Sequence, residues 1–235
     1  MVREEWVTKF VRTYAVRLAL DFVHRFRQGA MGMAEVPAHS EPVSIERVDE
    51  VMKATGLWWA IAGGWAIDLW LGVQTREHHD VEVVVRRIDQ GAVRAALVDD
   101  WELLCLDPLR SGWRSWSGHR IEPPAFQLQA RGAGGAFDLF LETADDEHWS
   151  YRRAATVRRR LAEVTATTAS SVPVVRPEVQ LLYMATSGEP KNADDFAIAA
   201  PRLGRAARAW LVEALGLAHP GHPWLVSLAG IGAEL

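Results

Sequence analysis

Two adjacent glycines, Gly63 and Gly64, constrain this chain more than any other feature of its sequence. The apolar run before them, residues 57–62, is too short for a buried helix and is typical of a buried strand. Residues 65–71 after them have helical spacing, and Gly72 is suited to cap the end of that helix. Glycine permits a sharp turn or the close approach of a ligand at the junction. The pattern therefore predicts a strand, a diglycine turn and a helix.

Two acids follow this unit at the start of the next apolar run. A helix that begins directly after two glycines points unpaired backbone N–H groups at the turn, and such a helix end attracts phosphate. Asp80 and Glu82 precede residues 83–85, and because strand side chains alternate, both carboxylates are expected on one face of a strand. Carboxylates that face a phosphate-attracting turn are suited to hold magnesium against a nucleoside triphosphate.

A third acid, Asp138, lies between apolar neighbours in a predicted hairpin. The hairpin consists of strands at residues 125–130 and 136–142, joined by a glycine-rich turn. Alternation separates Asp138 from its apolar neighbours and leaves it on the opposite face of the strand. Glu142, four residues on, shares that face and is the alternative to Asp138.

These elements together resemble the signature of a known superfamily. Gly63-Gly64, Asp80-Val81-Glu82 and Phe137-Asp138-Leu139 resemble the motifs of the DNA-polymerase-β-like nucleotidyltransferases. The longer stretches Gly63-Gly64-Trp65-Ala66-Ile67-Asp68 and Thr75-Arg76-Glu77-His78-His79-Asp80 are similar to the antibiotic-modifying branch, the aminoglycoside and lincosamide nucleotidyltransferases. The resemblance extends from Ser44 to Leu228.

The resemblance implies a fold and a set of site residues. The implied fold is α+β, with a mixed polymerase-β-like sheet flanked by helices and followed by a smaller helical domain. Asp80, Glu82 and Asp138 would hold two magnesium ions, and Asp138 is also the candidate to take the proton from the attacking hydroxyl. Gly63 and Gly64 would cradle the phosphates of the NTP.

Two cations are further candidates for nucleotide binding. Arg76 is suited to neutralise triphosphate charge through forked hydrogen bonds, and the alternative is a solvated loop. Lys191 lies in Pro190-Lys191-Asn-Ala-Asp-Asp-Phe196, which resembles a recurrent element of the family's helical half. A phosphate contact is expected for Lys191, against the alternative of a surface lysine.

The implied function is transfer of a nucleoside monophosphate from an NTP to a hydroxyl of a small molecule, such as an aminoglycoside or lincosamide antibiotic. One alternative is the same chemistry on tRNA or protein, as in toxin or defence enzymes. A formal charge of −4 and a pI near 6.1 give no electrostatic footprint for nucleic acid and favour a small or cationic acceptor.

Another alternative is a catalytically silent nucleotide-binding homologue. Glu82 permits it, because the family mostly carries aspartate there and one extra methylene moves a carboxylate by about 1.5 Å.

Three segments are expected along the chain: an N-terminal helix and linker at 1–43, the nucleotidyltransferase domain at 44–145 and a helical domain at 146–235. The first helix, residues 4–26, would dock on the domain or on a partner, and a homodimer is one such arrangement.

No apolar run reaches membrane-spanning length, no signal peptide is recognisable and Cys105 is the only cysteine, so a cytoplasmic protein is expected. Further predicted elements are a helix from Ser44 to Ala54, a helix at 89–98, a strand at 101–106, an irregular stretch at 107–124, and helices at 177–185, 194–200, 203–215 and after Pro223.

Overall fold

The computed structural model describes residues 42–108 and 112–231. The helix expected at residues 4–26 and the linker to residue 41 lie outside the described residues. Among the described helices, none has both the length and the apolar character needed to cross a membrane.

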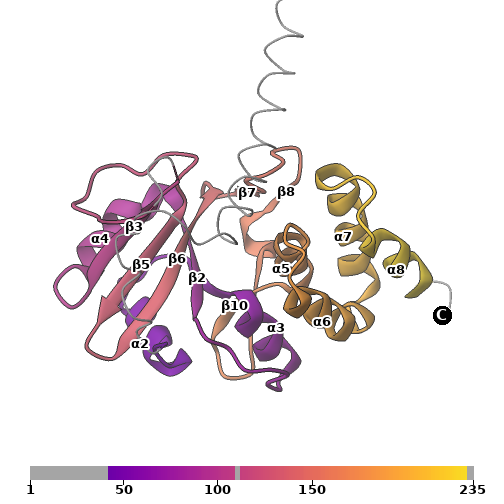
Figure 1. Cartoon of the computed structure of the whole chain (residues 1–235), viewed down its shortest axis with the longest axis horizontal. Coiled ribbons are helices and arrows are strands. Elements are labelled where there is room, and N and C mark those ends of the chain that lie inside the picture. The colour runs from indigo at the N-terminus through magenta and orange to yellow at the C-terminus, as the bar shows by residue number, and fades with distance from the viewer. Residues whose placement is uncertain (1–41, 109–111, 232–235) are drawn as a thin grey trace, which may run out of the picture. The chain divides into compact units, whose positions relative to one another are not determined.

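The described strands form one mixed sheet, with helices on either side of it (Figure 1). Its main path runs in the order β4-β3-β5-β6-β2-β1-β10-β9. Off this path, β7 pairs with both β6 and β8. The strands are β1 (Trp59–Ala62), β2 (Glu82–Arg86), β3 (Glu102–Asp107), β4 (Gly112–Ser115), β5 (Gln127–Gly132), β6 (Gly135–Ala144), β7 (His148–Ser150), β8 (Arg158–Arg160), β9 (Thr165–Thr167) and β10 (Pro173–Val175). The α-helices are α2 (Ile45–Thr55), α3 (Gly63–Leu71), α4 (Gln90–Leu97), α5 (Pro177–Met184), α6 (Pro190–Ala199), α7 (Arg205–Ala218) and α8 (Trp224–Ile231).

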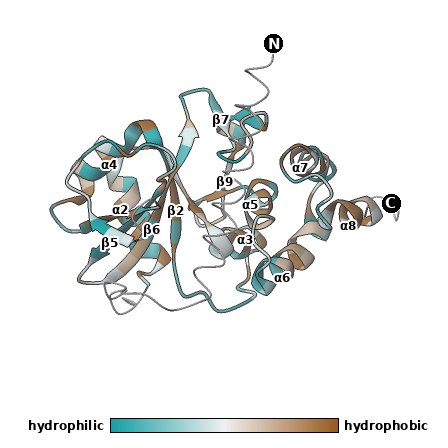
Figure 2. Cartoon of the chain, turned by 45° about the horizontal axis from the view of Figure 1, so that its top comes forward, coloured by the Kyte–Doolittle hydropathy of each residue, from teal (hydrophilic) through white to brown (hydrophobic). Residues whose placement is uncertain are grey.

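The core follows from the apolar periodicity of these elements. β1 is buried along its whole length, and the three valines in the middle of β2 are buried as well. In Figure 2 the apolar residues concentrate on the central strands and on the inner helices, whereas the peripheral loops are hydrophilic. Helix α2 presents Ile45, Val48 and Met52 to this core, and it is capped at both ends. Ser44 accepts a hydrogen bond from the backbone N–H of Arg47, and Gly56 takes the left-handed conformation at the other end.

The central hairpin is confirmed with a tighter turn than expected. β5 and β6 pair antiparallel as far as Gly132 and Gly135, so that only Ala133 and Gly134 form the loop. The stretch at 107–124 is not wholly irregular, because β4 pairs antiparallel with β3 at the edge of the sheet. Its residues are half-buried or exposed, and a polar edge strand of this kind lacks the apolar alternation that reveals a strand in a sequence.

The expectation of helical structure directly after Asp145 is wrong for residues 148–175, which contain four short strands. β10 enters the main sheet beside β1, where Ile61 and Val174 are partners in a parallel pair. Each of these strands has three residues, which is too few for a periodic signal. The consecutive helices begin only at Pro177, which occupies the first turn of α5 as expected. We therefore propose that the boundary of the helical part lies near residue 176 rather than 145.

A buried carboxylate anchors the loop between α3 and β2. Asp68 of α3 accepts hydrogen bonds from the backbone N–H of Thr75 at 3.0 Å and from its hydroxyl at 2.5 Å. The same carboxylate lies 2.6 Å from Nε2 of His78, and both side chains are 2% exposed. The ring of His78 in turn packs on Trp65, with 4.4 Å between the ring centroids. The loop that leads to Asp80 is therefore tied to the helix that starts at the diglycine.

We expect Asp68→Ala to lower the free energy of unfolding by about 2–4 kcal/mol, because it removes the shared acceptor of several buried donors. Chemical denaturation measures this loss, and hydrogen exchange should localise the loosening to residues 72–80. The matched control is Asp99→Ala, which removes an exposed acid and should leave stability within about 0.5 kcal/mol of the wild type. Equal stability of the two variants would contradict the anchoring role.

Candidate active site

Parallel pairing of β2 with β6 brings two of the predicted acids together. Glu82 and Asp138 are direct partners in the register of these strands, so their side chains lie next to each other on one face of the sheet. Gln129 of β5 is the partner of Asp138 on its other side. The amides of Gln127 and Gln129 donate hydrogen bonds of 3.1 and 2.9 Å to the two oxygens of Asp138. Hydrogen bonds to both of its carboxylate oxygens therefore hold Asp138 in place.

Burial makes both carboxylates unusually basic. It raises the pKa of Glu82 from 4.5 to about 7, and the negative charges of Asp80 and Asp138 add to the effect. Burial likewise raises the pKa of Asp138 from 3.8 to about 6, although the hydrogen bonds from the two glutamines act in the opposite direction. Two neighbouring acids whose pKa values are raised by burial and by each other's charge are a feature of functional sites.

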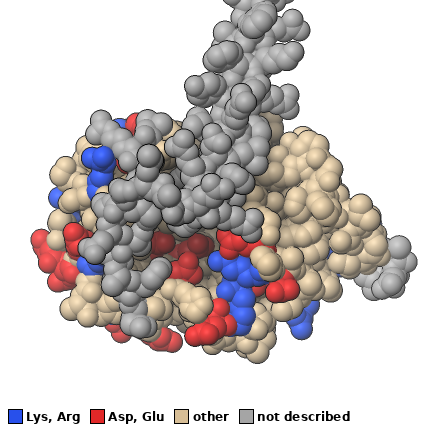
Figure 3. Space-filling model, viewed as in Figure 1, with Lys and Arg blue, Asp and Glu red and all other residues tan. Residues whose placement is uncertain are grey.

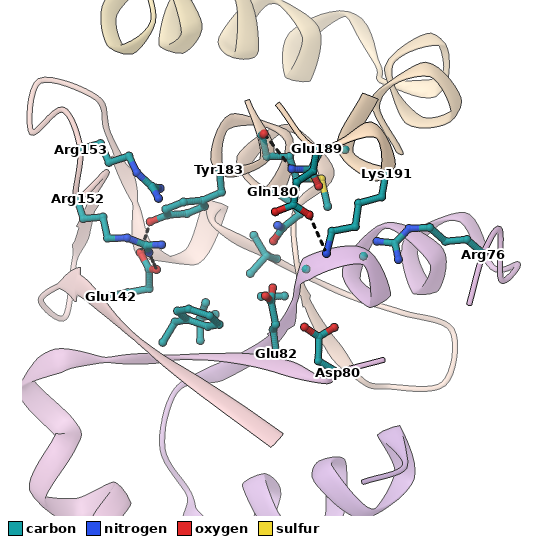
Figure 4. A pocket seen from close by; sticks show the side chains of 18 residues that line it. Arg76, Asp80, Glu82, Glu142, Arg152, Arg153, Gln180, Tyr183, Glu189 and Lys191 are labelled. Carbon is teal, nitrogen blue, oxygen red and sulfur yellow. Dashed lines mark hydrogen bonds and ion pairs between the residues drawn. The ribbon is translucent and has the colours of Figure 1, made fainter. Parts of the chain in front are cut away.

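Asp80 lies in the loop just before β2 rather than in the strand itself, because β2 begins at Glu82. Its side chain lines the same pocket of about 200 Å³ as that of Glu82, and Figure 4 shows the two carboxylates next to each other at one end. Asp138 is not among the residues that line this pocket. The structure thus brings Asp80 and Glu82 to the pocket surface and places Asp138 beside Glu82.

The diglycine lines the same pocket as Asp80 and Glu82. Helix α3 begins at Gly63 itself, two residues earlier than expected, and no side chain of the described residues caps its first turn. Gly63 has a φ of +67°, and a Cβ there would overlap the carboxylate of Glu82. A Cβ at Gly64 would overlap the side chains of Arg76 and His78. Both glycines are therefore needed for close packing, and both line the pocket with their N–H groups unpaired by any cap.

Arg76 lines the pocket but its charge is already paired. Its Nε and Nη2 each donate a 2.9 Å hydrogen bond to Asp195 of α6, whose side chain is 1% exposed. This forked pair ties the loop before β2 to the helical part of the chain. Asp195 was not singled out from the sequence, because no local pattern connects it with a residue so far away along the chain.

Lys191 also lines the pocket, as the second residue of α6. Its ammonium group lies 3.2 Å from Glu189, and both side chains are more than half exposed. Such an exposed pair contributes little to stability, so the lysine is free to exchange its partner for a phosphate. In Figure 4 the Lys191 side chain extends toward the acids.

Glu142, the alternative to Asp138 as the third acid of the site, is occupied by other contacts. Its buried carboxylate accepts hydrogen bonds from the indole of Trp149 at 2.6 Å, from the hydroxyl of Tyr183 at 2.5 Å and from Arg152 at 3.0 Å. Arg152 itself lies over the ring of Tyr183, 4.4 Å from its centroid. With three donors already bound, Glu142 is poorly placed to accept a proton from a substrate.

The acids suit a divalent cation in the kind of ligand atom that they offer. Magnesium prefers carboxylate oxygens, and Asp80, Glu82 and Asp138 supply them beside an uncapped helix start. In the present side-chain positions, however, no three His, Cys, Asp or Glu residues of the described segments converge closely enough to enclose one ion.

Comparisons with known proteins identify the family and the fold of this chain. Residues 44–199 match the family model of aminoglycoside-2''-adenylyltransferase. No curated protein sequence matches the chain. Among solved structures, the solution structure of the antibiotic-resistance factor ANT(2'')-Ia is 15% identical with a TM-score of 0.50, covering 81% of this chain and 96% of that one. The crystal structure of ANT(2'')-Ia in complex with adenylyl-2''-tobramycin is 17% identical with a TM-score of 0.50, and the match covers 72% of this chain and 94% of that one. At these identities the two structures establish the fold, including its mixed sheet and helical C-terminal part.

The match to the family model spans more than half of the chain and includes the diglycine, all three acids, and the two cations Arg76 and Lys191. The chain therefore belongs to the aminoglycoside-2''-adenylyltransferase family and is a nucleotidyltransferase.

Proposed function

We propose that this protein transfers a nucleoside monophosphate from an NTP to a hydroxyl group of a small-molecule antibiotic. The observation that carries the proposal is the register pairing of Glu82 with Asp138, beside Asp80 and the uncapped start of α3. Nucleotidyl transfer requires phosphate binding and charge neutralisation at one point. The start of α3 is suited to bind phosphate, and the acids are suited to hold the cations that would neutralise its charge, all within one family match.

The backbone N–H groups of Gly63 and Gly64 would bind the triphosphate, because they lie at the start of α3, where no side chain of the described residues caps the first turn. Lys191 would turn from Glu189 to a phosphate oxygen. Arg76 would act from its fixed position, since Asp195 orients its guanidinium at the pocket wall. Together these groups orient the nucleotide relative to the acids.

Asp80, Glu82 and Asp138 would hold two magnesium ions. When bound, the ions would supply the positive charge that offsets the phosphate oxygens of the attacked and leaving groups. The presence of Glu82 in place of a shorter aspartate is compatible with this role, because its carboxylate rests directly against Gly63.

Asp138 would accept the proton of the acceptor hydroxyl. As the hydroxyl oxygen bonds to the α-phosphorus, the bond to pyrophosphate breaks and the proton passes to the carboxylate. The amides of Gln127 and Gln129 keep the carboxylate oriented for this role.

The acceptor class is supported by family membership and by the charge of the chain. The family model is named for an enzyme that adenylylates aminoglycosides, and ANT(2'')-Ia has been solved with adenylyl-2''-tobramycin. A formal charge of −4 argues against a nucleic acid acceptor. Lincosamides remain a second acceptor type for the same chemistry.

We expect Asp80→Asn to lower transfer by on the order of 10²-fold or more while the fold is retained, because it removes ion-binding charge with little change in volume. Transfer is measured from each α-labelled NTP with Mg²⁺ to a panel of aminoglycosides and lincosamides. The control is Asp194→Asn, which neutralises an exposed acid on α6. Full activity of the Asp80 variant at unchanged Mg²⁺ dependence would refute the assignment.

We expect Glu82→Gln to stabilise the metal-free protein at pH 8 while abolishing transfer. The pKa of Glu82 is raised in the folded state, so the wild type loses stability as the pH rises from about 4.5 through 7. Below about pH 4.5 the carboxyl group is protonated in both states, and the advantage of the variant should vanish. Thermal unfolding in a chelator across pH 4–8 measures the difference. A variant that is less stable than the wild type at pH 8 would show that Glu82 is not an unfavourably buried charge.

A further inference from the structure

One carboxylate of the pocket has no role in the chemistry proposed above. The acids that line the pocket in the described part of the chain are Asp80, Glu82, Glu142 and Glu189. Asp80 and Glu82 are assigned to the metal ions, and Glu142 is held by three donors. The only partner of the Glu189 side chain among the described residues is the ammonium group of Lys191, at 3.2 Å. Glu189 is therefore the lining carboxylate whose partner is most easily exchanged.

The binding of a nucleotide would break this pair. Lys191 is the second residue of α6, where the positive end of the helix dipole disfavours a cation, so the lysine gains little from its present position. A triphosphate in the pocket would attract the ammonium group with several negative charges, against the single charge of Glu189. Because both side chains of the pair are more than half exposed, the exchange costs little. Glu189 would then be left as an unpaired anion at the pocket wall.

The backbone of Glu189 is held in place although its side chain is not. The residue occupies the N-cap position of α6, and its side chain makes no capping hydrogen bond with the described residues. Its backbone carbonyl accepts a 3.0 Å hydrogen bond from the N–H of Asn192. The buried amide of Asn192 in turn donates to the carbonyl of Met184 and to the hydroxyl of Ser187. These bonds tie the start of α6 to the end of α5, so the carboxylate stays at the pocket.

A buried amide lines the pocket together with Glu189. Gln180 of α5 is 5% exposed, and its side chain makes no hydrogen bond with the residues that the structure describes. Figure 4 shows Gln180 and Glu189 between Lys191 on one side and Arg152 and Arg153 on the other. A buried amide without partners is costly unless a ligand supplies them. Its carbonyl oxygen accepts hydrogen bonds from ammonium and hydroxyl groups alike.

We propose that Glu189 and Gln180 bind an ammonium group of the acceptor, and that Lys191 covers this site until a nucleotide draws it away. The inference rests on the transfer function proposed above and names two residues that select its acceptor. A freed carboxylate and an amide oxygen in one pocket suit an ammonium group, which has donors and no acceptor. On the visible face acidic and basic side chains lie next to each other (Figure 3), so attraction of a cation there depends on which individual carboxylates are unpaired.

The test uses tobramycin and its fully N-acetylated derivative, which share a skeleton and differ in charge. Each is titrated calorimetrically into the full-length chain and into its Glu189→Gln variant, with Mg²⁺ and with or without α,β-methylene ATP, which cannot release pyrophosphate. We expect Glu189→Gln to weaken tobramycin binding by about threefold to tenfold with the nucleotide, and by less than about twofold without it. The N-acetylated derivative should bind both proteins equally.

Three results of these titrations would overturn the proposal. They are an unchanged affinity of Glu189→Gln for tobramycin with the nucleotide present, an equal loss with and without the nucleotide, and no binding of tobramycin to the wild type. The matched control is Glu213→Gln, which neutralises an exposed acid of α7 outside the pocket and should leave every affinity unchanged. An equal loss in this control would mean that overall charge determines the affinity, and would also overturn the proposal.

Removal of Lys191 should act in the opposite direction. Lys191→Met uncovers Glu189 in the absence of a nucleotide, so this variant should then bind tobramycin about threefold to tenfold more tightly than the wild type. In the Glu189→Gln background the same change should have no such effect, because the carboxylate that it uncovers is gone. An equal gain in both backgrounds would contradict the proposal, since it would come from the loss of a positive charge and not from Glu189.

Gln180→Leu tests the amide. With the nucleotide present it should weaken tobramycin binding by about threefold to tenfold, because the ligand loses a hydrogen bond. The free energy of unfolding should not fall, since the amide has no partner within the described residues. Unchanged tobramycin affinity of this variant would show that Gln180 does not bind the acceptor, against the proposal.

Transfer measured in parallel separates this inference from the proposed function. If no NTP supports transfer while the loss in Glu189→Gln depends on the nucleotide as expected, the transfer function fails and the ammonium site stands. If tobramycin is modified and its KM is the same for Glu189→Gln and the wild type, the function stands and the inference fails.

Discussion

The pairing of β2 with β6 is the constraint on which the rest of the site depends. It places Glu82 and Asp138 side by side in a sheet whose surroundings raise the pKa of both. A metal-free fold gains nothing from two adjacent half-buried acids, because their repulsion and partial desolvation oppose folding. Their presence in an otherwise apolar run of strands is therefore best explained by what the site binds. The stability that the sheet provides elsewhere compensates for the charge that function requires.

The loop before β2 shows how the protein keeps this site in place. Asp68 fixes the middle of the loop to α3, and Asp195 fixes Arg76 to α6. The two buried carboxylates hold the loop from both sides, so the position of Asp80 depends on the first helix of the site and on the helical part together. A pocket assembled in this way requires the C-terminal helices even though the acids all precede them in the chain.

Glu142 illustrates how a residue of catalytic type can serve as scaffold. It lies on the same face of β6 as Asp138, yet β7 brings the indole of Trp149 to it and α5 brings Tyr183. Its role is to hold Arg152 at the pocket wall. The same short strands, β7 to β10, carry the chain from the hairpin to α5 and so help to determine which side chains line the pocket.

The sequence by itself determined the local units of this protein. The diglycine between an apolar run and a helical repeat, the capped helix α2 and the hairpin around Asp138 all follow from short-range periodicity and from the conformational freedom of glycine. The family could be recognised for the same reason, since its motifs lie within single strands and turns. Only the tertiary structure decided that Arg76 binds Asp195, that Glu142 is saturated by donors and that β10 joins the sheet beside β1. These contacts join segments far apart in the chain, and their geometry is set by the packing of whole elements rather than by any pattern within one of them.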